Sequence, residues 1–310
     1  MTTSLSGSWQ CFRLIGHNPA MRRALPLVLL SIVLVAGGCA PKQVNYVKPR
    51  PKFYKNVISL SPSTTEIIAS DADLTILKGR TAACDFPPAM VKPIQVVAAV
   101  KPDFEAIQGI KPDLVLCDKL LYSPQEIDQI KTQTHADVFT IDANTVDGYV
   151  QQLQQLGSMV AAEMRFNEYL GRVIAAKNSA IGGKPATTPK VAIILPGSGG
   201  NDLICGTDSF LADVVKISGG TMVGPKGEKF MSMNPEELVS LNPDVIIVNG
   251  TKDDTSSATS LLKDPRFQAV KAIKSQNLQA VETSILERRG ARVDQLITSV
   301  HRIIAGAVSG

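Results

Sequence analysis

The sequence predicts an α/β protein made of two Rossmann-like lobes with parallel sheets, joined by one long bridging α-helix. One observation is a repeat: residues 103–116 return as residues 234–247, and each copy has Glu (Glu105, Glu236) seven residues before a Pro-Asp pair. Each copy indicates a short amphipathic helix, a turn and a buried strand. The other observation is residues 146–183, where apolar residues recur at helical spacing over about 35 residues, roughly 50 Å of helix. A helix of that length between two βα halves predicts a spine.

Size and charge restrict the class of protein. The chain has 310 residues, 44% of them hydrophobic, which is enough for one large domain or two small ones. Its formal charge is +4, and without Arg13, Arg22 and Arg23 it has 29 basic and 28 acidic residues. A body so close to neutral predicts no nucleic-acid partner.

The N-terminus indicates export. Met21-Arg22-Arg23 precedes about a dozen apolar residues and then Gly37-Gly38-Cys39, which predicts a signal peptide over residues 1–38, with Met21 a suitable start. Cys39 follows small residues as in a bacterial lipoprotein, so we expect lipidation there; an uncleaved signal anchor is the alternative. Residues 39–55 contain three prolines and predict a tether. Both alternatives place the body in the cell envelope, on its periplasmic or extracellular face.

The cysteines and histidines of the body argue against a metal site. Cys84, Cys117 and Cys205 have no Cys-x-x-Cys spacing, so we expect buried thiols, with one disulfide as the alternative. His135 and His301 are far apart and lack ligand spacing, which gives poor support to zinc, manganese or haem ligation by His.

The first lobe is predicted at residues 56–145. Short apolar segments at 57–60, 74–77, 114–118 and 138–141 indicate strands, and they alternate with helical segments, which favours βαβ units. Ser63 or Thr64 is a candidate cap for the first helix, and Ser123-Pro124 with Glu126 predicts another helix start.

Two loops of this lobe are candidates for ligand contact. Ser61 and Pro62 follow a strand and precede a helix, at the edge where α/β proteins bind ligands. Asp85 and Phe86 lie in a rigid proline-bearing loop at residues 81–88. The alternatives are an ordinary capped turn and a Phe86 buried in the core.

The second lobe is predicted at residues 184–310. A strand at 190–195 leads into a glycine loop at 196–200, which lacks the Gly-Lys-Ser/Thr ending of a phosphate loop. Gly199 therefore indicates close approach of backbone to a ligand. A helix is expected at 208–217, a loop with Lys229 and Phe230 at 221–233, a strand near 278–281 and a last helix at 293–307.

The order of these motifs resembles the helical-spine class of substrate-binding proteins of ABC importers. The resemblance rests on Ile58-Ser-Leu-Ser-Pro62, Cys84-Asp-Phe-Pro-Pro88, Lys111-Pro-Asp-Leu-Val115, Gly219-Gly220 and Asn242-Pro-Asp-Val-Ile246. It implies a monomer that holds a small metal chelate between its lobes and passes it to a permease dimer with ATPase subunits. It also implies that Glu105 and Glu236 contact arginines of the permease; a helix-capping acid is the alternative.

The ligand is the least determined part. The resemblance implies a cobalamin-type corrinoid, with a ferric siderophore as the alternative; the protein needs no cofactor, since the ligand itself carries cobalt or iron. The single Trp, Trp9, lies in the leader, so Phe86, Tyr122 and Phe230 are the candidate aromatic contacts. Lys229, Arg288 and Arg289 suit an anionic chelate. A secreted α/β hydrolase is a remote alternative, because no His accompanies a candidate nucleophile, and we expect no enzyme.

Overall fold

The computed structural model describes residues 52–99, 101–197, 200–250 and 256–309. The predicted signal peptide, Cys39, most of the tether and Gly199 lie outside the described residues. Among the described helices, none is both long and apolar enough to span a bilayer.

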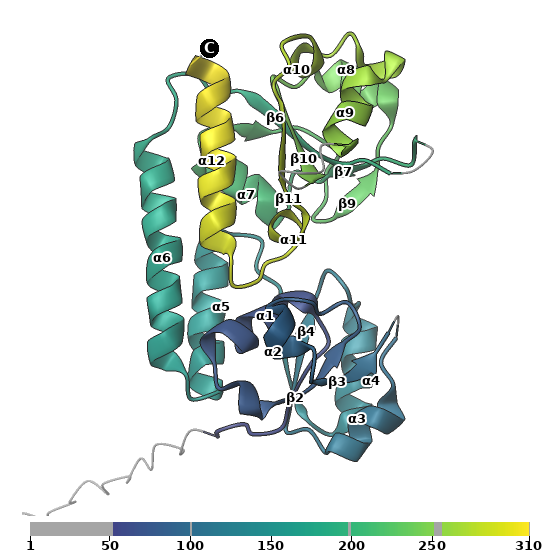
Figure 1. The fold of residues 1–310 in the computed structure, drawn as a ribbon, viewed down its shortest axis with the longest axis vertical. Helices are drawn as coiled ribbons and strands as arrows, with labels where there is room; N and C mark the ends of the chain where they lie inside the picture. The colour runs from purple at the N-terminus through teal and green to yellow at the C-terminus, as the bar shows by residue number, and fades with distance from the viewer. Residues whose placement is uncertain (1–51, 100, 198–199, 251–255, 310) are drawn as a thin grey trace, which may run out of the picture. The chain divides into compact units, whose positions relative to one another are not determined.

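The first lobe has a five-stranded parallel sheet in the order β3-β2-β1-β4-β5 (Figure 1). β2 and β3 lie on one side of β1, and β4 and β5 lie on the other side. The boundary between β1 and β4 is therefore a topological switch point. The strands are β1 (Val57–Ser59), β2 (Leu77–Thr81), β3 (Gln95–Ala98), β4 (Leu114–Asp118) and β5 (Asp137–Ile141), and the helices are α1 (Pro62–Asp71), α2 (Pro88–Val91), α3 (Phe104–Ile110) and α4 (Pro124–Thr134).

Two local predictions in this lobe were wrong. The residues expected as a strand at 74–77 form the 3-10 turn η1 (Leu74–Ile76), because the Asp73 side chain caps it by accepting from Thr75 N at 2.9 Å. The cap of α1 is Ser61, not Ser63 or Thr64: Pro62 takes the first helical position, where its missing N–H does no harm, and Ser61 Oγ accepts from Ser63 N at 3.1 Å. The predicted capping box at Ser123 and Glu126 is confirmed.

The second lobe has a six-stranded mixed sheet in the order β11-β10-β6-β7-β9, with β8 beside β6. The prediction of a parallel sheet was wrong for β7, which runs antiparallel to β6 and β9. Residues 196–202 between β6 and β7 are too few for the crossover that a parallel pair requires. The strands are β6 (Lys190–Leu195), β7 (Leu203–Cys205), β8 (Thr221–Met222), β9 (Phe230–Ser232), β10 (Val245–Gly250) and β11 (Leu278–Glu282).

The predicted helices of the second lobe are present in the predicted order, and α9 and α11 are additional to them. The helix expected at 208–217 begins at Phe210, because Ser209 is its cap, and the last helix extends to Ser309. They are α7 (Phe210–Ile217), α8 (Pro235–Leu241), α9 (Ser256–Lys263), η3 (Pro265–Phe267), α10 (Lys271–Lys274), α11 (Thr283–Leu286) and α12 (Val293–Ser309).

The predicted single bridging helix is two helices. α5 (Val146–Met159) and α6 (Glu163–Gly182) are separated by a turn in which Ala161 has φ 54°. They pack against each other, and Gly157 permits this because a Cβ there would lie 3.0 Å from the Phe166 side chain. α6 contacts α1 of the first lobe and α7 and α12 of the second. α5 contacts β5 of the first lobe and α7 of the second, so both helices bridge the lobes (Figure 1).

The repeated segment has the predicted helix, turn and buried strand in both lobes. α3 precedes β4 and α8 precedes β10, and both helices end at a left-handed residue, Lys111 and Asn242. The aspartate of each turn holds the first strand of its lobe: Asp113 Oδ1 accepts from Asn56 N at 3.0 Å, and Asp244 Oδ2 accepts from Lys190 N at 2.8 Å. The repeat therefore sets the strand pairing at the centre of each sheet.

Candidate functional site

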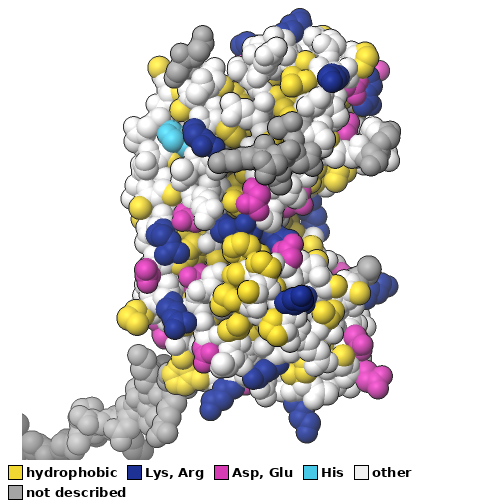
Figure 2. Space-filling model, viewed as in Figure 1, with side chains coloured by type: hydrophobic (Ala, Val, Ile, Leu, Met, Phe, Trp, Pro, Cys, Tyr) yellow, Lys and Arg dark blue, Asp and Glu magenta, His cyan; other side chains and the backbone are white. Residues whose placement is uncertain are grey.

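Arginines from the second lobe meet acids of the first lobe in the segment between α11 and α12. Arg288 pairs with Asp85 in the loop after β2, Arg289 with Asp118 at the end of β4, and Arg292 with Glu66 on α1. Figure 2 shows Lys and Arg side chains at the level where the two lobes meet. The switch point of the first lobe is thus occupied by the second lobe's arginines.

Two of these three contacts between the lobes are buried, the Arg292–Glu66 pair and the Arg289–Asp118 pair. Arg292 Nε and Nη2 donate to the two Glu66 oxygens at 2.8 and 2.9 Å, and Glu66 is 1% exposed. The guanidinium also lies 3.9 Å from the centre of the Phe86 ring and bonds Glu282 at 3.1 Å. Burial alone would lower the pKa of Arg292, but the bonds to Glu66 and the charge of Glu282 raise it above its ordinary value.

Arg289 is fixed from two sides but keeps one donor free. Nη1 donates to the carbonyl oxygen of Ala143 at 2.5 Å, and Nη2 donates to Asp118. Its Nε is buried and has no hydrogen-bond partner among the described residues. An unmatched buried donor is unusual in a folded protein and marks a position to be explained.

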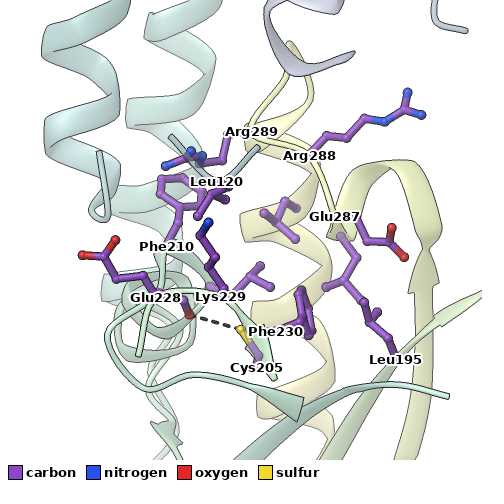
Figure 3. A pocket seen from close by; sticks show the side chains of 14 residues that line it. Leu120, Leu195, Cys205, Phe210, Glu228, Lys229, Phe230, Glu287, Arg288 and Arg289 are labelled. Atoms are coloured by element: carbon purple, nitrogen blue, oxygen red, sulfur yellow. Dashed lines mark hydrogen bonds between the residues drawn. The ribbon is translucent and has the colours of Figure 1, made fainter. Parts of the chain in front are cut away.

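A pocket of about 310 Å³ lies beside these arginines, at the carboxyl edge of the second sheet (Figure 3). Leu120 comes from the first lobe, and the other lining residues come from the second. The charged and polar residues of the lining are Lys229, Arg288, Arg289, Glu228, Glu287, Cys205 and Ser209. The apolar part of the lining is Leu120, Leu195, Phe210, Leu211, Phe230, Leu286 and Leu296.

Cys205 is the one cysteine in this lining. Burial raises its pKa to about 11, against the opposing bonds to Ser209 and to the Gly206 carbonyl, so the thiol is protonated at neutral pH. Cys84 and Cys117 are also buried free thiols, as predicted, and burial raises the pKa of Cys117 to about 12.

The structure brings some predicted site residues together and separates others. Lys229, Phe230 and Arg288 line the pocket. Asp85 is held at its margin by Arg288, at 2.5 Å, and Phe86 lies under Arg292.

The remaining predicted ligand residues lie elsewhere in the first lobe. Ser61 is fully buried as a helix cap, and Pro62 begins that helix. Tyr122 is half-buried against the cluster around Ile107 and Ile130, where burial raises its pKa to about 12. None of the three is in the lining of the pocket.

The sequence reasoning missed the acids and the third arginine. Arg292, Glu66 and Asp118 were not predicted, nor were Phe210 and Leu286 in the pocket wall. The spacing of Arg288, Arg289 and Arg292 between a strand and the last helix was a usable signal. No signal in the sequence identifies the acids, because they lie more than 170 residues away, with separations of 171 and 226.

The two predicted docking acids are exposed in the first turns of equivalent helices. Glu105 lies on α3 and Glu236 on α8, and neither has an ion pair among the described residues. Capping is done by other side chains: Asp103 accepts from Ala106 N at 3.0 Å, and Asn234 accepts from Glu236 N at 2.9 Å. In Figure 1 both helices lie on the side of the molecule away from α6.

Two α/β lobes, a helix packed along both and a pocket at their junction define a two-lobed binding-protein fold. The chain belongs to the periplasmic binding protein family, whose model matches residues 57–281. The predicted membership of the helical-spine class is confirmed.

The relatives give the fold and a range of ligands. The chain is 29% identical over 153 residues to the high-affinity heme uptake system protein IsdE of Staphylococcus aureus (strain bovine RF122 / ET3-1), which is 48% of this chain and 51% of that protein. The match thus spans about half the length of this relative. The periplasmic vitamin B12 binding protein BtuF of Vibrio cholerae has a TM-score of 0.71 at 17% identity, over 84% of this chain and 100% of that one. The periplasmic heme-binding protein RhuT from Roseiflexus sp. RS-1 has a TM-score of 0.67 at 21% identity, over 82% and 99%. Both structures show similarity of fold.

Proposed function

We propose that this chain is the extracytoplasmic substrate-binding protein of an ABC importer and that its substrate is haem or a closely similar iron tetrapyrrole. The pocket at the junction of the lobes carries this proposal. Its wall combines Phe210, Phe230 and several leucines with three basic side chains, Lys229 and two arginines, and with two glutamates, of which Glu228 is paired with Lys119. A ligand with a flat apolar ring would pack against the phenylalanines and leucines, and anionic groups at the edge of that ring would face the basic side chains.

Haem is favoured over the corrinoid and the siderophore. A volume of about 310 Å³ lies at the small end of ligand pockets. Cobalamin is larger than haem and its side chains are neutral amides, whereas haem carries two carboxylates. The relative that is 29% identical is named for heme uptake. The corrinoid and the ferric siderophore are kept as the alternatives to be tested.

Binding of haem here would depend on the ring and its edge more than on the iron. Of the side chains that usually hold haem iron, the pocket lining contains Cys205. Because its thiol is protonated at neutral pH, it is a poor ligand in this conformation. Phe210, Phe230 and the basic groups therefore supply most of the contact.

The hydrolase alternative finds no support in the described histidines. His135 ends α4 in a left-handed conformation, and His301 Nδ1 faces the carbonyl of Ser218 at 3.5 Å. A hydrolase needs its His beside a nucleophile.

The partners and the location follow from the same role. Glu105 and Glu236 would meet the permease dimer, whose ATPase subunits drive import, and Cys39 would hold the monomer to the membrane by a lipid. Mass measurement of the N-terminal peptide from cells tests the anchor: a diacylated Cys39 is expected, and an unmodified N-terminus at any other residue contradicts it.

Thermal and chemical unfolding of the purified full chain tests the ligand. A ligand at a hundredfold excess over its Kd should raise the free energy of unfolding by about 2.7 kcal/mol. We expect that rise with iron(III) protoporphyrin IX and a smaller one, or none, with cyanocobalamin and a panel of ferric siderophores. Phe230→Ala should weaken haem binding, and Phe53→Ala, whose side chain is 52% exposed and outside the pocket, should not. If none of the three ligand classes changes stability, the proposed function is wrong.

A further inference from the structure

Of the charged groups that line the pocket, all but Lys229 and Glu287 have an oppositely charged partner among the described residues. Glu228 pairs with Lys119 at 3.1 Å, Glu287 accepts from Asn249 at 3.0 Å, and Arg288 pairs with Asp85. Lys229 forms no hydrogen bond or ion pair within the part of the chain that the structure describes. Among the described residues, Lys229 is thus the one cation of the lining without an ion pair, and Glu287, whose hydrogen bond comes from a neutral amide, is the one acid without an ion pair.

Arg289 adds an unused donor to the same pocket. Its side chain is 4% exposed, its Nη atoms are committed to Asp118 and Ala143, and its Nε–H is left without a partner. The Asp118 carboxylate balances the charge of Arg289. What Arg289 lacks is a hydrogen-bond acceptor for its Nε–H. Figure 3 shows Lys229 extending toward the part of the pocket where Arg289, Leu120 and Phe210 are drawn.

We propose that the pocket binds one ionised carboxylate of the substrate, held by Lys229 Nζ and by Arg289 Nε–H, and so selects tetrapyrroles with free carboxylates over amidated or esterified ones. This inference rests on the proposed function. A carboxylate has one negative charge and several acceptor sites, which matches one free ammonium and one free N–H. The surrounding Phe210, Phe230 and leucine side chains lower the local dielectric and strengthen both contacts.

The two groups would act in order. Lys229 is exposed and meets the carboxylate first. Arg289 Nε is closed to water in this structure, so the carboxylate reaches it only after it displaces a lining side chain. The buried bond then forms where water does not compete for it.

Binding of iron(III) protoporphyrin IX and of its dimethyl ester to the full chain tests the proposal, because the ester keeps the ring and the iron but has no ionised carboxylate. We expect the acid to bind about 10- to 100-fold more tightly than the ester. Lys229→Met should remove most of this ratio, whereas Lys226→Met, an exposed lysine of the same loop outside the pocket, should leave it unchanged. Arg289→Lys keeps a positive charge opposite Asp118 but removes the Nε–H. Combined with Lys229→Met, it should reduce the acid-to-ester affinity ratio further. Unfolding curves show whether the double variant is folded.

The outcomes separate this inference from the proposed function. Equal binding of acid and ester, or a ratio unaffected by Lys229→Met, overturns the carboxylate site while import of haem stands. Competition by millimolar inorganic phosphate as strong as that by acetate would show a general anion site and overturn the selectivity. If neither porphyrin binds and cyanocobalamin does, the carboxylate site is wrong and a binding-protein role survives; if nothing binds, both proposals fail.

Discussion

Arg292 binds both carboxylate oxygens of Glu66 across the boundary between the lobes, at 2.8 and 2.9 Å, with both side chains at least nine-tenths buried. Gly290 makes room for this pair, since a Cβ there would lie 2.7 Å from the Glu66 carboxyl carbon. The carbonyl of Gly290 also accepts from Tyr149 at 2.7 Å and Tyr169 at 3.0 Å, on α5 and α6. The arginine segment, α1 and the helices α5 and α6 are therefore joined in one buried polar cluster.

Removal of one partner of this pair should strongly destabilise the protein. We predict that Arg292→Met lowers the free energy of unfolding by about 3–5 kcal/mol, because Glu66 is left as a buried, unpaired charge. The double variant Arg292→Met with Glu66→Leu should recover most of the loss, because no charge is then stranded. Urea unfolding of the three proteins measures this.

A partly exposed pair serves as the control for that prediction. The Lys177 side chain is 20% exposed and pairs with Asp147, whose side chain is 72% exposed and stays solvated, so Lys177→Met should cost less than about 1 kcal/mol. Equal losses for Lys177→Met and Arg292→Met would show that burial of the Glu66 pair has no special effect.

Asp71 at the end of α1 should make stability depend on pH. Burial raises its pKa to about 6, with Asp294, Glu168 and Glu66 adding to the rise and Arg172 opposing it. One Asp71 oxygen is buried without a partner in the described part of the chain. Since the ordinary pKa is 3.8, the folded protein binds more protons than the unfolded chain between these values. The free energy of unfolding should therefore fall as pH rises from about 4 to about 6, by up to about 3 kcal/mol from this group.

Asp71→Asn tests the effect, because it cannot ionise. At about pH 7.5 the variant should be more stable than the parent by up to about 3 kcal/mol, and at about pH 4 the difference should nearly vanish. Asp128→Asn, a change at an exposed carboxylate on α4, is the control. Parallel stability–pH curves for the parent and Asp71→Asn would contradict the prediction.

The sequence predicted the parts of the fold that depend on nearby residues. The repeat around Asp113 and Asp244 was readable because helix, turn and strand follow one another within a dozen residues. The contacts of Arg288 and Arg292 were not, because their partners lie 203 and 226 residues away. The pocket could not be predicted for the same reason, because Leu120 and Arg289 lie on different lobes and come together only in the folded protein. The antiparallel direction of β7 follows from the short connection at residues 196–202. The pattern of apolar residues does not indicate strand direction.

The break between α5 and α6 was hidden for a specific reason. Residues on both sides keep helical spacing, and the residue that turns the chain is Ala161, not Gly or Pro. Ala in the left-handed region is strained by roughly 1–2 kcal/mol, and part of this is regained by Gly. We predict that Ala161→Gly raises the free energy of unfolding by about 0.5–1 kcal/mol. Ala175 is solvent-exposed in the middle of α6, and Ala175→Gly should lower the free energy of unfolding by about 1 kcal/mol. If both variants lose stability by the same amount, residue 161 is not strained.

The paired acids Glu105 and Glu236 should matter for uptake and not for substrate binding. They lie one on each lobe, exposed in the first turns of α3 and α8, where each can accept a bidentate arginine from a two-fold permease. We predict that Glu105→Ala with Glu236→Ala abolishes uptake of iron(III) protoporphyrin IX by cells that depend on this protein, while the purified variant binds the porphyrin as the parent does. Glu237→Ala, one residue further along α8 and also exposed, is the matched control and should leave uptake intact. Normal uptake with both glutamates removed would exclude the docking role, and loss of porphyrin binding in the double variant would place these residues in the fold or the pocket instead.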